Sequence, residues 1–413
     1  MATKKADSKP DIEAASEAVD RGESTSLMEP MLIGESPRRT AVTDLVVELA
    51  SRSAGLRRSL PEGVTAALAD LVRAMNCYYS NLIEGHDTHP VDIERALRND
   101  YSTDARKRDL QLEATAHIAV QRWIDDGGLD GRALTVEGLR DVHRRFCERL
   151  PASLLEVENP ETGERRPVVP GALRDRDVRV GQHIAISPGA VGRFLRRFEQ
   201  AYGRLGKTDR ILSAAAAHHR LLWIHPFLDG NGRVARLMSH AVLREALDTG
   251  SVWSVARGLA RNVARYKAHL GKCDLGRRND LDGRGTLSEE ALVGFTRFFL
   301  ETCIDQVTFM EGLVQPARLR ARIMIWAEEE VRAEALPPRS GAVLEAVLFR
   351  GELPRGDVAT LLGTGDRQAR RVTAALVERE VLTAESSRAP LRLNFPATLA
   401  ARWMPGLFPE RGD

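Results

Sequence analysis

Two helical stretches joined by a glycine-rich turn place the strongest constraint on how this chain folds. Residues 209–224 are apolar and rich in alanine, and residues 233–247 resume a helical pattern after the turn. Ala/Leu/Arg/Glu runs recur along the chain, and only 5% of the residues are aromatic, a composition that favours helix over sheet. We therefore predict a mainly α fold.

The composition narrows the class of protein. The 413 residues are 43% hydrophobic and 29% charged, as in ordinary globular proteins with two or three domains. With 60 Lys and Arg against 58 Asp and Glu, the net charge of +2 gives no general attraction for nucleic acid or membranes. No apolar run approaches about 18 residues, and the first residues lack a signal-peptide core, so we expect a cytoplasmic protein with no membrane partner.

Neither the cysteines nor the paired histidines suggest a metal site. The four cysteines show no C-x-x-C spacing, so we expect reduced, mostly buried thiols. They are Cys77, Cys147, Cys273 and Cys303. His218 and His219 are adjacent and cannot share a helix face, so we interpret them as structural residues.

Composition and periodicity divide the chain into segments. Residues 1–38 are polar and aperiodic, so we expect a disordered N-terminal tail. Helical patterns then fill residues 39–130 and 131–335. Beyond them we expect a linker at 337–338, a small module over 340–396 and a C-terminal tail over 397–413.

One stretch interrupts the helical pattern. That pattern otherwise predicts a helix that begins at residue 40, a second that begins at Pro61 and stops at Gly85, and further helices at about 91–99, 104–125, 135–149, 189–202, 257–271, 288–314 and 315–334. Proline and glycine residues surround the alternating run Val178-Arg179-Val180-Gly181 and the apolar residues that follow at 184–186. This pattern predicts a short β-hairpin within residues 170–188.

The glycine-rich turn carries residue types suited to a nucleotide. Gly230, Asn231 and Gly232 tolerate positive φ, so their N–H groups can converge on an anion at the start of the next helix. Arg233 and Arg236 are three residues apart on one helix face and can hold phosphate oxygens.

Two further residues of the turn supply acid–base and metal chemistry. Asp229 precedes the anion-binding turn, and one carboxylate together with phosphate oxygens is a usual way to hold Mg²⁺. The imidazole of His225 can accept a proton from an incoming hydroxyl near neutral pH.

Residues 225–236 match the signature HPFx[DE]GNGRxxR at every specified position, and in this the chain resembles the Fic family. The resemblance implies a Fic-type helical core over residues 131–335. It also implies transfer of a nucleoside monophosphate, most often AMP from ATP, to a Ser, Thr or Tyr hydroxyl of a target protein. His225 would then be the base and Asp229 the Mg²⁺ ligand.

The same resemblance assigns the ATP contacts. The α- and β-phosphates would lie on Gly230, Asn231, Gly232 and Arg233, and the γ-phosphate on Arg236. The rest of the expected ATP site comprises Val234 and Ala235 in the signature, and Asn262 and Tyr266 as contacts of the adenine base.

Two more family features are matched outside the signature. Ser80-x-x-x-Glu84-Gly85 resembles the inhibitory motif [ST]xxxE[GN], which implies that Glu84 pairs with Arg236 and keeps the basal rate low. The predicted hairpin resembles the family's flap. A target segment would add to its edge beside Val178, Val180 and Gly181.

The C-terminal module resembles the winged helix-turn-helix that follows the core in similar proteins. Its pattern predicts helices at 341–349, 355–362 and 366–380, followed by extended segments at 382–384 and 391–394. The third helix displays Arg367, Gln368, Arg370 and Arg371, which suit a DNA groove. The alternative is a protein-docking or homodimer surface.

Other functions remain open at this point. The turn binds phosphates and says little about the base, so the transferred group could differ, or removal of AMP from targets could dominate. A third alternative is a nucleotide-sensing DNA-binding regulator.

Overall fold

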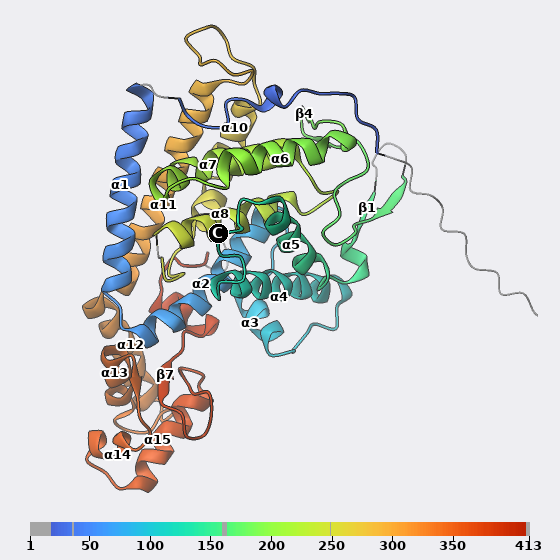
Figure 1. The fold of residues 1–413 in the computed structure, drawn as a ribbon. Helices are drawn as coiled ribbons and strands as arrows, with labels where there is room; N and C mark the ends of the chain where they lie inside the picture. The colour runs from blue at the N-terminus through green and yellow to red at the C-terminus, as the bar shows by residue number, and fades with distance from the viewer. Residues whose placement is uncertain (1–17, 35–36, 159–162, 248, 410–413) are drawn as a thin grey trace, which may run out of the picture.

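The computed structural model describes residues 18–34, 37–158, 163–247 and 249–409. Helices dominate these residues, which confirms the mainly α prediction (Figure 1). The helices of the core are α1 (Pro37–Arg58), α2 (Glu62–Ile83), α3 (Pro90–Leu97), α4 (Ala105–Asp125), α5 (Val136–Cys147), α6 (Val191–Tyr202), α7 (Lys207–Ile224), α8 (Asn231–Leu247), α9 (Val255–Arg261), α10 (Val263–Cys273), α11 (Glu289–Val314) and α12 (Pro316–Arg332).

The pair α7 and α8 lies at the centre of this core. The two helices pack against each other on either side of the turn that joins them. Four consecutive alanines of α7, residues 214–217, are all buried, and their small side chains allow close approach of neighbouring helices. Helices α2, α4 and α5 contact α8, while α1 and α11 contact α7 (Figure 1). The turn is therefore reached by side chains from several elements.

Backbone geometry explains two helix boundaries. Gly85 follows the C-cap of α2 with φ of 85°, a conformation that favours glycine, so the predicted stop at this residue is confirmed. The prediction of one helix over 257–271 is wrong. Asn262, with φ of −119° and ψ of 32°, leaves the helical region and separates α9 from α10.

Two short strand pairs lie between α5 and α6. β1 (Glu156–Glu158) pairs antiparallel with β2 (Arg165–Pro167). β3 (Arg179–Val180) pairs antiparallel with β4 (His183–Ile184), with Val180 opposite His183. The interruption of the helical pattern thus contains strands, although the predicted pairing is only two residues long on each side.

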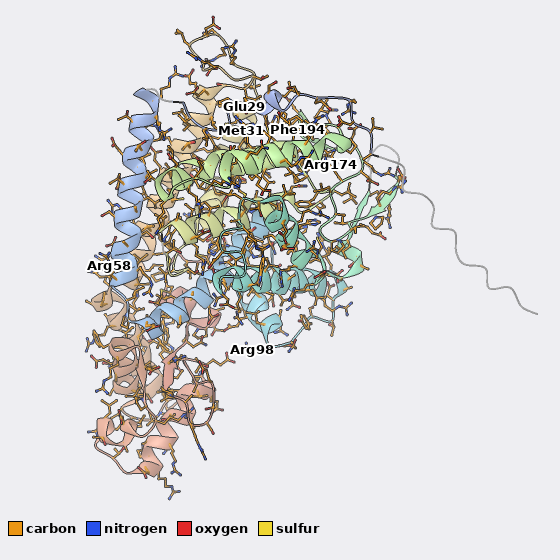
Figure 2. All side chains as sticks on the ribbon, viewed as in Figure 1. Glu29, Met31, Arg58, Arg98, Arg174 and Phe194 are labelled. Atoms are coloured by element: carbon orange, nitrogen blue, oxygen red, sulfur yellow. The ribbon has the colours of Figure 1, made fainter. Side chains whose placement is uncertain are left out.

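The N-terminal residues 18–34, here called the N-terminal strap, correct the prediction of a disordered tail over residues 1–38. A short 3-10 helix, η1 (Thr25–Met28), lies within the strap, and Met28, Met31 and Ile33 are buried. The Tyr202 hydroxyl of α6 donates to the Met31 carbonyl at 2.6 Å, in the region labelled in Figure 2. These apolar side chains anchor the strap together with its polar contacts, such as those of Glu23 with Ser187. Residues 1–17 and 35–36 lie outside the described residues.

The C-terminal module contains α13 (Ser340–Arg350), β5 (Glu352–Leu353), α14 (Asp357–Leu362), α15 (Asp366–Glu378), β6 (Leu382–Thr383) and β7 (Leu391–Leu393). The three strands form an antiparallel sheet in the order β5-β7-β6. The three helices and the last two strands match the expected order. β5 was not predicted, because two residues are too few for an alternating pattern.

The prediction of a C-terminal tail over residues 397–413 is wrong for its described part. After η4 (Ala397–Leu399) and α16 (Ala400–Trp403), the chain returns to the core, as Figure 1 shows in red. Trp403, Met404 and Leu407 are buried. Residues 410–413 lie outside the described residues.

All four cysteines are buried free thiols, as predicted. Among the residues that the structure describes, no helix combines the length and the apolar character that a membrane crossing requires.

Candidate active site

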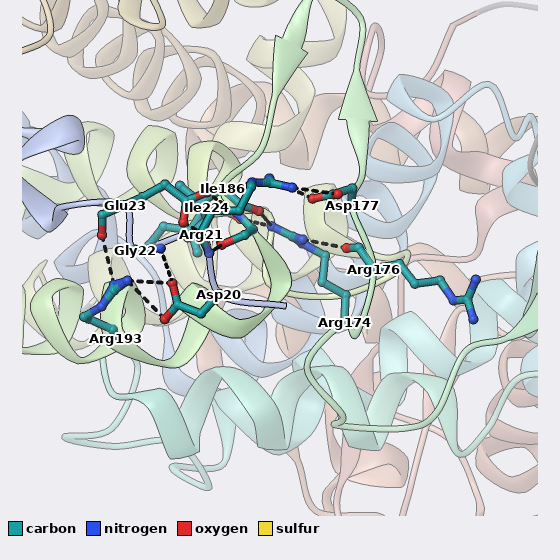
Figure 3. Close-up of polar contacts among 11 residues, drawn as sticks. Asp20, Arg21, Gly22, Glu23, Arg174, Arg176, Asp177, Ile186, Arg193 and Ile224 are labelled. Carbon is teal, nitrogen blue, oxygen red and sulfur yellow. Dashed lines mark hydrogen bonds and ion pairs between the residues drawn. The ribbon is translucent and has the colours of Figure 1, made fainter. Parts of the chain in front are cut away.

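The turn between α7 and α8 begins at a residue with a strained backbone conformation, His225, whose carbonyl is bound by Arg174. His225 follows α7 with φ of 52° and ψ of 62° in the left-handed region. The Arg174 Nε atom donates to the His225 carbonyl at 2.7 Å. The Arg174 guanidinium also donates to the carbonyls of Ile186 at 2.5 Å and Arg176 at 2.6 Å (Figure 3). Arg174 therefore joins the turn to the segment that carries β3 and β4.

Asn231 closes the turn from within. Its side-chain oxygen accepts from the Phe227 N–H at 3.0 Å, and its side-chain amide donates to the Phe227 carbonyl at 2.8 Å. Gly230 has φ of 80°, a conformation that favours glycine. α8 starts at Asn231, so the first N–H groups of this helix lack intrahelical acceptors and suit an anion.

His143 of α5 supports the same turn, a role that the sequence analysis missed. Its ring stacks on Phe227 with centroids 4.0 Å apart and an interplanar angle of 1°. Its Nδ1 accepts from the Gly171 N–H at 2.9 Å, so the proton lies on Nε2, which donates to the Asp229 carbonyl at 3.2 Å. Burial lowers the pKa of His143 to about 4, so the ring stays neutral.

The protonation state of His225 suits a base. Its Nδ1 lies 3.3 Å from the Leu222 carbonyl, and since a carbonyl only accepts, Nδ1 carries the proton. Burial lowers the pKa of His225 to about 4. At neutral pH the imidazole is therefore neutral, with a lone pair on Nε2.

Arg236 is bound by the motif at the end of α2. Its Nε donates to the Ser80 hydroxyl at 2.8 Å and its Nη2 to the Ser80 carbonyl at 3.1 Å. Nη2 also forms an ion pair with Glu84 Oε1. Burial raises the pKa of Glu84, but the Arg236 and Arg233 guanidiniums outweigh it, and the pKa lies below its usual value. The expected pairing of Glu84 with Arg236 is present in the structure.

The Glu84 carboxylate also covers the glycine turn. A Cβ atom built on Gly232 would collide with Glu84 Oε1 and lie 3.2 Å from Arg236 Nη1. The carboxylate thus occupies the space in front of Gly232 where an anionic group would meet the start of α8. Gly232 is the residue that makes this approach possible.

Arg233 has two partners that the sequence analysis did not identify. Its Nη2 forms an ion pair with Glu113 of α4, a carboxylate with a 2% exposed side chain. His86 Nδ1 lies 2.7 Å from Glu113 Oε2 and 3.1 Å from Arg233 Nη2. Glu113 is 120 residues from Arg233, so no local spacing could have revealed the pair.

The position of Asp229 suits a metal ligand that acts together with oxygens of a bound substrate. Its side chain is exposed, and no hydrogen bond or ion pair of that carboxylate is found within the described residues. No cluster of three or more His, Cys, Asp or Glu side chains suited to a metal ion occurs in the described part of the chain. A cation at Asp229 would therefore need oxygens from a bound phosphate chain.

The remaining expected ATP residues make contacts within the protein. The side chains of Val234 and Ala235 are buried, and the Val234 N–H donates to the Gly230 carbonyl at 3.0 Å. The Tyr266 hydroxyl lies 2.7 Å from His218 Nε2, and its ring is buried. The Asn262 side-chain amide donates to the Gly258 carbonyl at 3.0 Å.

The β3–β4 pair lies beside the turn and is bounded by the N-terminal strap. The Val178 carbonyl accepts from Ala185 N–H at 3.2 Å, Gly181 has φ of 61° in the connecting turn, and Val180 is exposed. At its base, Arg21 of the strap donates to both Asp177 carboxylate oxygens (Figure 3).

Comparison with known proteins finds a family whose sequence pattern includes this site. Residues 133–243 match the Fic/DOC family. The protein adenylyltransferase Fic of Drosophila erecta is 27% identical over 171 residues, which cover 41% of this chain and 32% of that relative. The protein of the same name from Drosophila mojavensis is 27% identical over 218 residues, which cover 51% of this chain and 40% of that relative. The chain thus spans about a third to two fifths of the curated relatives it matches.

The fold resembles a solved structure over most of the chain. The crystal structure of a Fic family protein from Desulfovibrio desulfuricans G20 superimposes with a TM-score of 0.51 and 17% sequence identity. The match covers 87% of this chain and 97% of that one. At this identity the likeness concerns the fold alone.

Proposed function

We propose, from the Fic/DOC match of residues 133–243 and the geometry of the turn, that the protein is a self-restrained protein adenylyltransferase. It would transfer AMP from ATP to a Ser, Thr or Tyr hydroxyl of a target protein. One observation carries the proposal: three features lie together at one turn. They are a neutral His225, the preformed start of α8, and Arg236 paired with Glu84.

The turn supports an in-line transfer of the AMP group. The target hydroxyl oxygen attacks the α-phosphorus of ATP, and the bond from that phosphorus to the β-phosphate bridging oxygen breaks. The hydroxyl proton passes to His225 Nε2, which the bond between Nδ1 and Leu222 leaves unprotonated. Pyrophosphate leaves, and AMP remains on the target through a phosphodiester bond.

Mg²⁺ fits this site through Asp229. When bound, the ion would neutralise negative charge on the phosphate chain. The exposed Asp229 carboxylate would hold it. His143 keeps that residue's backbone in place by donating to its carbonyl.

The restraint follows from competition for one guanidinium. Arg236 would take the γ-phosphate of ATP, but its Nη2 is paired with Glu84, and Glu84 also covers Gly232. A carboxylate and a phosphate oxygen cannot occupy the same donor positions. ATP therefore binds productively only in molecules whose Glu84 has moved.

Target docking is assigned to the β3–β4 pair. The exposed strand residues Val180 and Ile184 offer apolar contact and an open edge for a target segment. The pair is tied to the turn through Arg174, which sets the distance between a docked hydroxyl and His225.

A separate proposal concerns the C-terminal module. The order of its elements suits a winged helix-turn-helix, and Arg367, Arg370 and Arg371 are exposed on α15. We propose that this face binds DNA. Binding should weaken steeply with added salt, and Arg367→Ala and Arg371→Ala should reduce it. Salt-independent binding, or none with any duplex, would reject the idea.

The function is tested by following each phosphate of ATP separately. Glu84→Gly protein is incubated with Mg²⁺, cell lysate and ATP labelled at either the α- or the γ-phosphate. We expect protein-bound label from α-labelled ATP alone, and none in Glu84→Gly/His225→Ala protein. Label from γ-labelled ATP would indicate a kinase, and no label from any nucleotide would reject transferase activity.

A further inference from the structure

The end of the chain contacts the inhibitory helix α2 directly before its motif. The Tyr79 hydroxyl donates to the Leu407 carbonyl at 3.0 Å, and the Tyr78 ring meets Phe408 edge-on with centroids 5.8 Å apart. These two tyrosines are the residues that immediately precede Ser80. The segment therefore lies against α2 about one helical turn from Glu84.

The same segment has a fixed place on the core. Arg257 of α9 donates to the Gly406 carbonyl at 2.7 Å, and its guanidinium lies 3.6 Å from the centre of the Phe309 ring. Leu407 is completely buried. The segment is thus bound by α2 and α9, and Gly406 lies beside the Phe309 ring of α11.

The opposite end of α2 also meets the C-terminal part of the chain. Gly63, in the first turn of α2, lies so close to the Gly351 backbone that a Cβ atom at Gly63 would collide with the Gly351 carbonyl. Strand β7 contacts α2 as well. Helix α2 is therefore held by C-terminal residues at both of its ends.

We propose that residues 404–408 form a C-terminal clamp that holds α2 in its restraining position. The clamp grips Tyr78 and Tyr79, while the next residue, Ser80, accepts the hydrogen bond from Arg236. Glu84 is the C-cap residue of α2, so a displacement of the end of this helix that carries Glu84 away from Arg236 also breaks the contacts with Leu407 and Phe408. Release of the clamp is a step in activation.

This inference rests on the proposed function and assigns regulation to a segment outside the active site. It also explains the two aromatic residues before the motif. Tyrosine at positions 78 and 79 supplies a hydroxyl donor and a ring for the C-terminal clamp, which small residues there would lack.

The test introduces Leu407→Ala and Phe408→Ala into the 413-residue protein. The matched control is Phe349→Ala, which truncates a 54% exposed ring on α13. Hydrogen exchange of the amides of residues 80–84 and self-labelling by α-labelled ATP are measured for each protein. We expect both to increase by about tenfold in the clamp variants, the change that about 1.4 kcal/mol produces, and neither to change in the control.

An increase in labelling cannot arise from misfolding, because unfolded protein loses activity. Unchanged exchange at residues 80–84 would overturn the clamp. Faster exchange without more labelling, in a preparation where Glu84→Gly labels strongly, would overturn its role in regulation. If Glu84→Gly itself is silent, the proposed transferase function fails, and the exchange measurement alone decides whether the segment holds α2.

Discussion

At the scale of single residues, two histidines at the turn after α7, His225 and His143, each have a tautomer that is fixed by one backbone neighbour. The Leu222 carbonyl fixes the proton of His225 on Nδ1, and the Gly171 N–H fixes that of His143 on Nε2. His143 is buried and His225 is half-buried. Loss of solvent lowers both pKa values to about 4, so both rings are neutral at pH 7. One of them is thereby left to accept a proton and the other to hold the backbone that carries Asp229.

His143→Phe should lower the affinity for Mg²⁺ without emptying the core. Phenylalanine keeps the stacking on Phe227 but loses the hydrogen bond to the Asp229 carbonyl and the one that His143 accepts from the Gly171 N–H. We expect the Mg²⁺ concentration for half-maximal labelling in the Glu84→Gly background to rise about fivefold, since a lost hydrogen bond costs roughly 1 kcal/mol. A lower maximal rate with an unchanged Mg²⁺ dependence would show that His143 has a structural role alone.

Ser80→Ala should partly release the restraint. The substitution removes the acceptor of Arg236 Nε while leaving the Glu84 ion pair in place. Hydrogen bonds to charged groups contribute about 1.5–3 kcal/mol, so we expect labelling to rise about tenfold. The same change in the Glu84→Gly background should add little, because the two residues act on one guanidinium. Equal effects in both backgrounds would contradict that coupling.

At the scale of elements, the N-terminal strap links segments on both sides of the β3–β4 pair. Arg21 bonds Asp177 before β3, and Glu23 accepts from the Ser187 N–H at 2.8 Å and from its hydroxyl at 2.5 Å after β4. The pair itself has two residues per strand and would be marginal alone. The strap therefore holds the proposed docking hairpin at its base together with Arg174, which bonds the carbonyls of Arg176 and Ile186.

Glu23→Ala should loosen the strap and the hairpin together. Burial raises the pKa of Glu23, but the hydrogen bonds from Ser187 lower it to about 2, so the carboxylate is charged in the folded protein. We expect faster proteolysis within residues 18–34 and 175–187, measured by mass spectrometry, with helix content unchanged. Cleavage at the wild-type rate would show that the apolar residues of the strap hold it alone.

Sequence patterns predicted the elements with long periodic runs and missed those defined by distant partners. The helices and residues 225–236 were predictable because each forms from neighbours in sequence. Arg233 could be identified as a phosphate ligand, but its pairing with Glu113 could not, because 120 residues separate the two. The prediction of a disordered tail was wrong for the strap for a related reason. The stretch is polar on average, and its three buried apolar residues, Met28, Met31 and Ile33, do not form a periodic pattern.

At the scale of the whole molecule, five histidines with lowered pKa values, four of them buried and His225 half-buried, make stability depend on pH. Burial lowers their pKa values to about 3 for His117 and His218 and about 4 for His143, His219 and His225. The unfolded chain binds protons at these residues near the ordinary value of 6.5, before the folded chain does. Stability is therefore full above about pH 6.5 and falls as the pH decreases toward 4.

Urea unfolding at several pH values measures this effect. We expect the free energy of unfolding to fall from pH 7 to pH 5, with a proton uptake on unfolding that approaches about five protons. His143→Phe should reduce that uptake by about one. A free energy of unfolding that stays constant from pH 7 to pH 5 would contradict the claim that these histidines are neutral in the folded protein.

Two segments that are far apart in the sequence contact elements beside the turn. The N-terminal strap holds the proposed docking hairpin, and residues 404–408 hold the helix that carries Glu84. The sequence analysis predicted a tail for each segment, and the structure instead packs both against the core through buried apolar side chains.

The most direct test of this account is the initial rate of α-³²P label transfer by wild type and Glu84→Gly, with Glu62→Gly as control. Glu62 is exposed in the first turn of the same helix. We predict that Glu84→Gly raises the rate about 100-fold, as expected when roughly 1% of wild-type molecules have Arg236 free, and that Glu62→Gly leaves it near the wild-type rate. Equal rates for wild type and Glu84→Gly would contradict the claim that Glu84 restrains the enzyme.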